Sequence, residues 1–404
     1  MTFNGKLLIR VYGKSLFAHR ETQAPITAKR LLFLLLFPPL YMLLELVNWI
    51  CLGLDDICFS SYRHLDVQDP VFIVGFPRSG STFLHRLLAK DAAQFTSMKL
   101  WEILFAPSIL QKKFWLMVGA WDRKLGNPLS TFVLAFEKWQ FKEVRKIHKI
   151  GLFEMEEDEI ILLHIFSSAF LNFMFPFDDL RPLVNFDTQC SARQRRQIMT
   201  FYKRCIQRHL YVFGKQKHFL SKNPAFSSKI QSLGETFPTA KVICIVRNPL
   251  EAIPSAINWI AYGFNTFNRF DNQCAQAQRL LDWIAHWYPY PLEQLEPWPN
   301  HRKMIVNYTH LIHEPATLVS DLYDCLGFDL SDRFRTMLAD EATRARHYTS
   351  QHRYSLSQFG MSAEQIVTDF QEIFTRFDFP HAESQGVESH GNTGHAECFT
   401  KNIP

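Results

Sequence analysis

A segment rich in glycine, serine and threonine follows the apolar run Val71–Val74 and reads Gly75-Phe-Pro-Arg-Ser-Gly-Ser-Thr82. Where such a loop enters a helix, unpaired backbone N–H groups and the positive end of the helix dipole favour an anion. Gly75 and Gly80 allow the tight turn that brings this backbone close to a ligand, and Arg78 adds a cation inside the turn. The pattern predicts a phosphate-binding loop between a buried strand and a helix.

A second cation, Arg247, follows another apolar run, Val242–Val246. Here Arg247 precedes a predicted helix over Leu250–Tyr262, with Pro254 in its first turn. The planar guanidinium group of arginine suits a phosphate dianion, and Ser255 would face that anion from the helix. The two segments together predict two phosphate contacts at the ends of two strands.

Nucleoside triphosphatases differ from this pattern at both segments. Their loop GxxxxGK[ST] has a lysine where this chain has Ser81, and the nearest lysine here is Lys90, well down the helix. A magnesium-dependent phosphate hydrolase would also place an acidic metal ligand near the end of the second strand, where this chain has Arg247. A P-loop kinase or nucleoside triphosphatase is therefore the alternative hypothesis. A non-catalytic membrane-associated scaffold is a further alternative, although it would need no set of phosphate ligands.

These segments resemble the sulfotransferase superfamily that uses 3′-phosphoadenylyl sulfate (PAPS), in its broad branch with a Pro-Arg-Ser-Gly-[ST]-[ST] loop, here Pro77–Thr82. Further matches stand in the same chain order within residues 70–379. They are Leu220-Ser-Lys-Asn-Pro224, the strand-loop-helix segment Phe237–Ser255, Asn307–Pro315 followed by Cys325-Leu-Gly-Phe328, and Tyr354-Ser-Leu-Ser-Gln-Phe-Gly360. The resemblance implies transfer of a sulfuryl group from PAPS to a hydroxyl or an amine, with no metal required.

The resemblance also assigns roles to single residues. Arg247 and Ser255 would bind the 3′-phosphate, which distinguishes this donor from ATP. Lys222 would stabilise the charge that develops on the oxygens of the breaking bond. The 5′-phosphosulfate would be held by the loop amides together with Arg78, Ser79, Gly80, Ser81 and Thr82.

The general base is expected between His148 and Glu157. Related sequences carry a histidine followed in the chain by Glu-Asp-Glu, which aligns Glu157 with the acidic position, although Met155 replaces the proline usual in the family. An imidazole, or a carboxylate whose pKa is raised by burial, would each accept a hydroxyl proton. The four acids Glu156–Glu159 would also suit a charged helix N-terminus with no catalytic role. Both His148 and Glu157 are therefore kept as candidates.

The elements that must position these residues alternate along the chain. Apolar runs at Val71–Val74, Phe219–Leu220, Val242–Val246 and Met304–Val306 predict buried strands separated by longer helical stretches. We expect an α/β fold with a P-loop-like parallel sheet flanked by helices, the sulfotransferase fold, in one domain over residues 70–379. Ligands of such sheets bind at the carboxyl ends of the strands, where both phosphate segments fall.

The N-terminal part differs in composition. Residues 31–54 contain one charged residue, Glu45, and follow a basic tail over residues 1–30. Because a bilayer core takes about 20 apolar residues, we expect the segment 31–54 to associate with a membrane. It would form a single span or, given Pro38-Pro39 and Glu45, a kinked, in-plane or re-entrant helix. A buried helix of the soluble domain is the remaining alternative.

The distribution of charge bears on the membrane topology of the chain. If the segment spans, the basic tail favours a cytosolic N-terminus and a lumenal, Golgi-type catalytic domain, whereas an in-plane helix or hairpin would leave the domain on the cytosolic face. The net charge of +5 is modest and concentrated in the tail, which suits anionic lipids better than nucleic acid. Residues 381–404 are expected to form a disordered tail. The sequence does not indicate an oligomeric state.

Aromatic residues are concentrated in two segments. We expect most of these residues to pack in the core. Others would line an apolar acceptor pocket, lie against a membrane or stack on sugars. With the N-terminal segment, they favour a lipid-like or amphipathic hydroxyl acceptor over a glycan. The segment 101–139 contains Phe105, Phe114, Trp115, Trp121 and Phe132, and the segment 259–298 contains Trp283, Trp287, Tyr288 and Tyr290.

Overall fold

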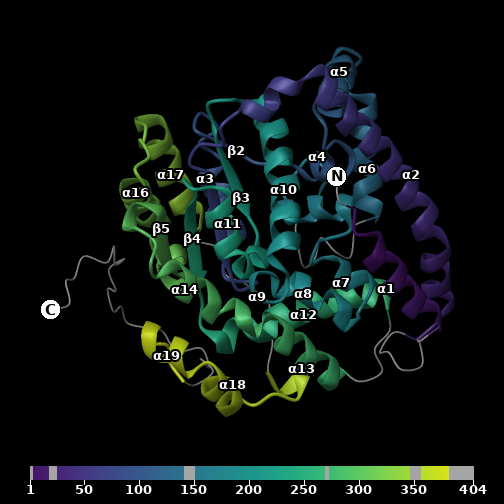
Figure 1. Ribbon diagram of the computed structural model, residues 1–404. Helices are drawn as coiled ribbons and strands as arrows, with labels where there is room; N and C mark the ends of the chain where they lie inside the picture. The colour runs from purple at the N-terminus through teal and green to yellow at the C-terminus, as the bar shows by residue number, and fades with distance from the viewer. Residues whose placement is uncertain (1–2, 18–24, 141–150, 269–272, 346–355, 382–404) are drawn as a thin grey trace.

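The computed structural model describes residues 3–17, 25–140, 151–268, 273–345 and 356–381 of the chain (Figure 1). Its centre is a five-stranded parallel sheet in the order β2-β3-β1-β4-β5. The expected parallel sheet and its four apolar strands are confirmed, and a two-residue strand, β2, extends the sheet at one edge. The strands are β1 (Val71–Gly75), β2 (Phe95–Thr96), β3 (His218–Lys222), β4 (Lys241–Val246) and β5 (Lys303–Asn307).

The strand order places β1 between β3 and β4, so that the ends of these strands meet at one edge of the sheet. Ile73 lies opposite Lys222 of β3, and Gly75 lies opposite Ile245 of β4. Strands β1 and β4 are buried along their whole length, as parallel strands are when helices cover both faces. The loop after β1 therefore lies between the residues that follow β3 and β4.

Helices cover both faces of the sheet (Figure 1). One face shares a buried apolar cluster with α3 (Ser81–Leu88), α15 (Tyr308–His313), α16 (Pro315–Leu326) and α17 (Asp332–Ala345). The other face shares a larger cluster with the long helices α10 (Ala192–Phe213) and α12 (Pro249–Phe267). Shorter helices complete that side: α4 (Leu100–Phe105), α7 (Leu171–Met174), α8 (Arg181–Val184), α9 (Phe186–Gln189), α11 (Ile230–Thr236), α13 (Gln273–Ile284), α14 (Pro289–Leu295), α18 (Ala363–Asp369) and α19 (Gln371–Phe377).

Helix α12 begins earlier than the sequence suggested. Pro249 occupies its first helical position, where the missing N–H group costs nothing. Pro254 consequently lies inside the helix and not in its first turn, which corrects the expected start. The Asn248 side chain caps the helix by accepting a hydrogen bond from the Leu250 N–H at 2.9 Å. This cap fixes the direction in which the chain leaves Arg247 at the end of β4.

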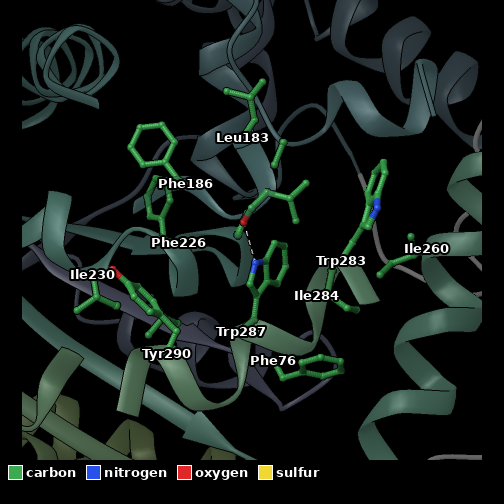
Figure 2. Packing of buried hydrophobic residues seen from close by; sticks show 14 of the residues in the cluster. Phe76, Leu183, Phe186, Phe226, Ile230, Ile260, Trp283, Ile284, Trp287 and Tyr290 are labelled. Carbon is green, nitrogen blue, oxygen red and sulfur yellow. Dashed lines mark hydrogen bonds between the residues drawn. The ribbon is translucent and has the colours of Figure 1, made fainter. Parts of the chain in front are cut away.

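The two aromatic segments differ in burial. The four aromatic residues named from the segment 259–298 are all buried. Figure 2 shows Trp287 and Tyr290 in this core together with Phe226, and the Trp287 Nε1 group donates a hydrogen bond to the Val184 carbonyl at 3.0 Å. The five named from the segment 101–139 are exposed, with Trp121 at 67%. Core packing is therefore confirmed for the second segment and wrong for the first.

Four helices from the first third of the chain lie together on one side of the molecule in Figure 1: α1 (Gly5–Phe17), α2 (Ala28–Cys58), α5 (Ile109–Lys124) and α6 (Pro128–Gln140). Helix α2 contains the predicted membrane segment and continues through Pro38 and Pro39. It is long and apolar enough to cross a membrane. Its residues Leu34 and Tyr41 nevertheless belong to the core cluster of the domain. One face of α2 is thus packed on the domain, and the opposite face is exposed.

Candidate active site

The predicted phosphate-binding loop, residues 75–82, has the backbone that its glycines require. Gly75 and Gly80 have φ values of +133° and +86°. A Cβ atom on Gly75 would lie 2.3 Å from the Ile245 carbonyl oxygen, and one on Gly80 would lie 3.0 Å from the ring of Tyr308. Gly80 is the N-cap of α3, so the first turn of that helix faces the loop. The strand-loop-helix geometry expected from the sequence is present.

The loop contacts the second cationic segment through Arg78. The Arg78 Nε group donates a hydrogen bond to the Ser255 hydroxyl oxygen at 3.2 Å. The Arg247 Nη1 group donates to the Arg78 carbonyl oxygen at 3.0 Å. Residues that stand far apart in the sequence, on the β1–α3 loop and on the β4–α12 segment, thus meet around one loop residue. Both arginine side chains remain partly exposed.

Arg247 has two further neighbours that the sequence interpretation did not assign to the site. Its Nε and Nη2 groups donate to Glu251 Oε2 at 3.0 and 2.9 Å, and its Cζ atom lies 4.2 Å from the centre of the Tyr308 ring. The four-residue spacing of Arg247 and Glu251 at a helix start would have predicted the ion pair. The contact with Tyr308 joins segments far apart in sequence, so the residue pattern carried no signal for it.

Lys222 and Glu157 form an ion pair beside this loop. Lys222 is the last residue of β3, and its Nζ atom lies 2.9 Å from Glu157 Oε1. Lys222 is 1% exposed and the Glu157 side chain is 14% exposed, so the carboxylate lies nearer to solvent. Two of the three predicted catalytic residues are therefore in contact. His148, the third, lies outside the described residues.

The acids that follow Glu157 are buried at the start of the 3₁₀ helix Asp158–Ile165. Asp158 accepts hydrogen bonds from the Ser221 hydroxyl at 2.7 Å and from the Tyr202 hydroxyl. Burial raises the pKa of Asp158 to about 6. Asp158 follows Glu157 and Ser221 precedes Lys222, so the Asp158–Ser221 hydrogen bond joins the two chain segments that carry the Lys222–Glu157 pair. The sequence interpretation missed this positioning residue.

Glu159 points to a different part of the domain. It accepts hydrogen bonds from the Ser168 hydroxyl at 2.6 Å and from the Ala169 N–H at 2.9 Å, and it pairs with Lys229 at 3.2 Å. Burial raises the pKa of this carboxyl group as well. Glu157, Asp158 and Glu159 therefore have separate partners, which argues against a merely solvated helix N-terminus. Glu157 is the member of the run that contacts Lys222.

His85 lies behind the loop on α3 and is fully buried. Burial, and then the charge of Lys222, lower the pKa of His85 to about 3, so its imidazole is neutral at physiological pH. Its Nε2 atom lies 2.9 Å from the Ser97 hydroxyl, which in turn donates to the Leu220 carbonyl at 2.8 Å. His85 thereby links α3 to β3 and fixes the loop helix relative to Lys222.

Comparison with known proteins identifies the family that this arrangement matches. The model of the family described as "Sulfotransferase family" matches residues 70–332. Omega-hydroxy-beta-dihydromenaquinone-9 sulfotransferase Stf3 from Mycobacterium bovis and from Mycobacterium tuberculosis are each 28% identical over 364 residues, covering 85% of this chain and 84% of theirs. The matched family region includes the loop, Lys222 and Arg247.

Two solved structures share the fold. Sulfotransferase STF1 from Mycobacterium tuberculosis superposes with a TM-score of 0.68 at 18% identity, covering 91% of this chain and 92% of that one. Sulfotransferase STF9 from Mycobacterium avium superposes with a TM-score of 0.67 at 18% identity, covering 83% of this chain and 84% of that one. At this identity the likeness concerns the fold alone.

Proposed function

This chain belongs to the sulfotransferase family, and we propose that it transfers a sulfuryl group from PAPS to a hydroxyl group on a lipid-like acceptor. The observation that carries the proposal is the meeting of the phosphate loop with Arg247 around Arg78, beside the Lys222–Glu157 pair. The two segments proposed to bind phosphate and the proposed base come from chain segments at the carboxyl edge of one parallel sheet, where ligands of such sheets bind.

The donor would be held at its two phosphate ends. The loop amides, Arg78 and the hydroxyls of Ser81 and Thr82 would bind the 5′-phosphosulfate at the start of α3. Arg247, supported by Ser255 through Arg78, would bind the 3′-phosphate. The Ser79 hydroxyl is buried with no hydrogen-bond partner among the described residues, which is consistent with a polar ligand at this loop.

The proposed reaction is one displacement at sulfur. The acceptor oxygen forms a bond to sulfur, and the bond from sulfur to the bridging phosphate oxygen breaks. The Glu157 carboxylate takes the proton of the acceptor hydroxyl, because its side chain is the part of the ion pair that reaches solvent. Lys222 donates to the oxygens that gain negative charge. The products are a sulfate ester and adenosine 3′,5′-bisphosphate.

Exposed apolar side chains near the segment that leads to Glu157 favour a lipid-like acceptor over a soluble sugar. The mycobacterial relatives are named for an omega-hydroxy-beta-dihydromenaquinone, a hydroxyl-bearing acceptor. In this chain α6, which carries the exposed Phe132 and Phe136, contacts the segment that leads to Glu157, since Glu137 of α6 accepts a hydrogen bond from the Leu152 N–H at 2.6 Å. An acceptor with a long apolar part would find matching surface there.

Ligand-induced thermal shifts test the donor. We expect adenosine 3′,5′-bisphosphate to stabilise the full chain equally with and without magnesium, and ATP to stabilise it far less. Stabilisation by ATP that requires magnesium would instead support a P-loop kinase or nucleoside triphosphatase. Lack of protection by either nucleotide would support the scaffold hypothesis.

Isotope-labelled PAPS tests the acceptor class. The full chain is incubated with labelled PAPS and either a membrane lipid extract or a water-soluble glycan fraction, with the Glu157→Gln variant as control. We expect label in the lipid fraction that depends on Glu157. Label that appears only in the glycan fraction would contradict the acceptor class and leave the reaction type intact.

A further inference from the structure

The exposed large apolar side chains of the described residues all lie between Ile9 and Phe153. Most of them belong to α2, α5 and α6, which are adjacent on one side of the molecule (Figure 1). On α2 the outward positions include Leu35 and Leu43, at 63% and 61% exposed. Contiguous apolar patches of this kind are rare on soluble monomers and mark an interaction surface.

The exposed charges on the same three helices have one sign. Among their described residues, every exposed charged side chain is basic: Lys29, Lys113, Arg123, Lys124 and Lys138. The acids of these helices are withdrawn from the surface, since Glu45, Asp55, Asp122 and Glu137 are buried and Asp56 is partly buried. An apolar surface with basic residues around it is complementary to hydrocarbon beneath anionic headgroups.

The inner face of α2 is bonded to the catalytic domain from end to end. Near its start, the Arg30 guanidinium donates to the Asn268 side chain and, at 3.2 Å, to the Met174 carbonyl oxygen. Near its end, Asp55 pairs with Arg208 at 3.0 Å. Both arginines are buried. The two ends of the helix are therefore fixed to the same body.

The middle of α2 is bonded to the domain as well. The Glu45 carboxylate lies 2.8 Å from His164 Nδ1, with both side chains buried. The Asn48 Oδ1 atom accepts a hydrogen bond from the Gln111 side chain of α5 at 2.7 Å. The Trp49 indole donates to the His164 carbonyl oxygen at 3.2 Å. These contacts join α2 to α5 as well as to the domain.

Length decides whether α2 can cross a bilayer while it keeps these contacts. From Arg30 to Asp55 the helix is about 38 Å long, and the hydrocarbon core of a bilayer is about 30 Å thick. A spanning α2 would pull the polar groups that it contacts at Met174, His164 and Arg208 through that core. The contacts and a transmembrane orientation are incompatible.

We propose that α2, α5 and α6 form a single membrane-binding face and that α2 lies in the plane of one leaflet. Their outward apolar side chains, such as Leu35, Leu43 and Trp121, enter the hydrocarbon, and the basic residues contact anionic headgroups. Both ends of α2 and the whole catalytic domain remain on one side of the membrane. The proposal concerns binding and does not depend on the reaction.

A second copy of the chain fits the same face less well. In a twofold dimer the same patch of both copies meets itself, so the cations Lys29, Arg123 and Lys124 of both copies would be gathered at one interface. Like charges at such an interface oppose association. A lipid leaflet with anionic headgroups has the opposite charge and a continuous apolar interior.

Vesicle co-sedimentation of the full chain tests the face. We expect binding to vesicles of phosphatidylcholine with phosphatidylglycerol, and weaker binding to phosphatidylcholine alone. The triple variant Leu35→Gln, Leu43→Gln, Trp121→Gln should bind on the order of a hundred-fold more weakly or worse, whereas Leu35→Ile with Leu43→Ile should bind normally. An unchanged circular dichroism spectrum and melting temperature show that each variant is folded.

Matched charge variants test the basic residues. Arg123→Gln with Lys124→Gln should weaken binding to the anionic vesicles by about ten-fold. Arg333→Gln with Arg335→Gln, which removes two exposed arginines from α17 on the far side of the molecule in Figure 1, should leave binding unchanged. Equal effects of both pairs, or no vesicle binding by the parent chain, would overturn the proposal. So would self-association that the apolar triple variant abolishes.

Labelling of the two ends of α2 tests its orientation. An introduced cysteine at Ala28 and the native Cys58 are both exposed positions. In sealed membranes from cells that make the protein, an impermeant maleimide should reach both positions or neither before detergent is added, as read by peptide mass spectrometry. Labelling of one end alone would show that α2 spans the bilayer and would refute the in-plane orientation.

Discussion

Replacement of Arg247 by alanine should weaken the binding of adenosine 3′,5′-bisphosphate and spare that of adenosine 5′-monophosphate. In the structure the Arg247 guanidinium is held by Glu251 at 2.9 and 3.0 Å and by the Arg78 carbonyl oxygen at 3.0 Å. The proposed 3′-phosphate must therefore share this guanidinium with a carboxylate. Whether the phosphate can do so depends on the relative strengths of the two interactions.

The free energies of the two interactions of Arg247 favour the phosphate over Glu251. The Glu251 side chain is 42% exposed, and such surface ion pairs contribute about 0–1 kcal/mol. A charge-assisted contact to phosphate contributes roughly 1.5–3 kcal/mol. Arg247→Ala should therefore weaken bisphosphate binding by about ten- to a hundred-fold. Glu251→Gln removes the competing carboxylate and should strengthen binding by a few-fold.

Isothermal titration of the two nucleotides separates this effect from damage to the loop. Arg247 also contacts the backbone of Arg78, so a variant with a displaced loop would lose affinity for both ligands. The expected result is a loss confined to the ligand with a 3′-phosphate. Equal losses for both ligands, or weaker bisphosphate binding in Glu251→Gln, would refute the assignment of Arg247 to the 3′-phosphate.

Three further outcomes are expected. Glu157→Gln should lower turnover at saturating acceptor by about 10²–10⁴-fold with nearly unchanged bisphosphate affinity, and near-normal turnover would move the base elsewhere. Folding raises the pKa of Asp158 from 3.8 to about 6, so the contribution of this carboxyl group to stability is present at low pH and is lost as the pH rises through this range. The melting temperature of Asp158→Asn should lack this part of the pH dependence. A pH profile identical to that of the parent chain would contradict the prediction. Deletion of residues 1–55 removes Glu45 and Asp55, which pair with His164 and Arg208, and uncovers the apolar core against which Leu34, Tyr41 and Leu52 pack, so the truncated chain should unfold or aggregate. A folded, soluble product by circular dichroism would show that α2 is dispensable.

Local pattern predicted the elements of the sheet and the phosphate loop. Apolar runs identified β1 and β4, since parallel strands buried on both faces are continuously apolar. Shorter apolar runs identified β3 and β5, which are less completely buried. Strand β2 has two residues, too few for such a pattern. The glycines of the loop were predicted because their conformations are a local property of the chain.

Contacts across the fold were less accessible from the sequence. Tyr308 lies against Arg247, and Asp158 against Ser221, only because the sheet brings separate segments together. For α2, the apolar composition predicted a membrane-associated segment but did not indicate that one face of the helix packs on the domain. Glu45, Asn48, Leu52 and Asp55 are spaced by three and four residues and are all buried. The helical spacing of these residues, three of them polar, was the signal for packing on the domain.

The contacts along α2 also bear on how far the enzyme can reach. A domain tethered through one flexible point can tilt and bring its active site to many heights above a lipid surface. If α2 lies in the plane of the membrane as proposed, a domain bonded to it at Arg30, Glu45 and Asp55 cannot tilt in this way. The distance from the bilayer to Lys222 and Glu157 would then be fixed by the structure of the protein. Acceptors would be sorted by the height at which their hydroxyl group stands above the hydrocarbon, and their encounter with the enzyme would be a search in two dimensions.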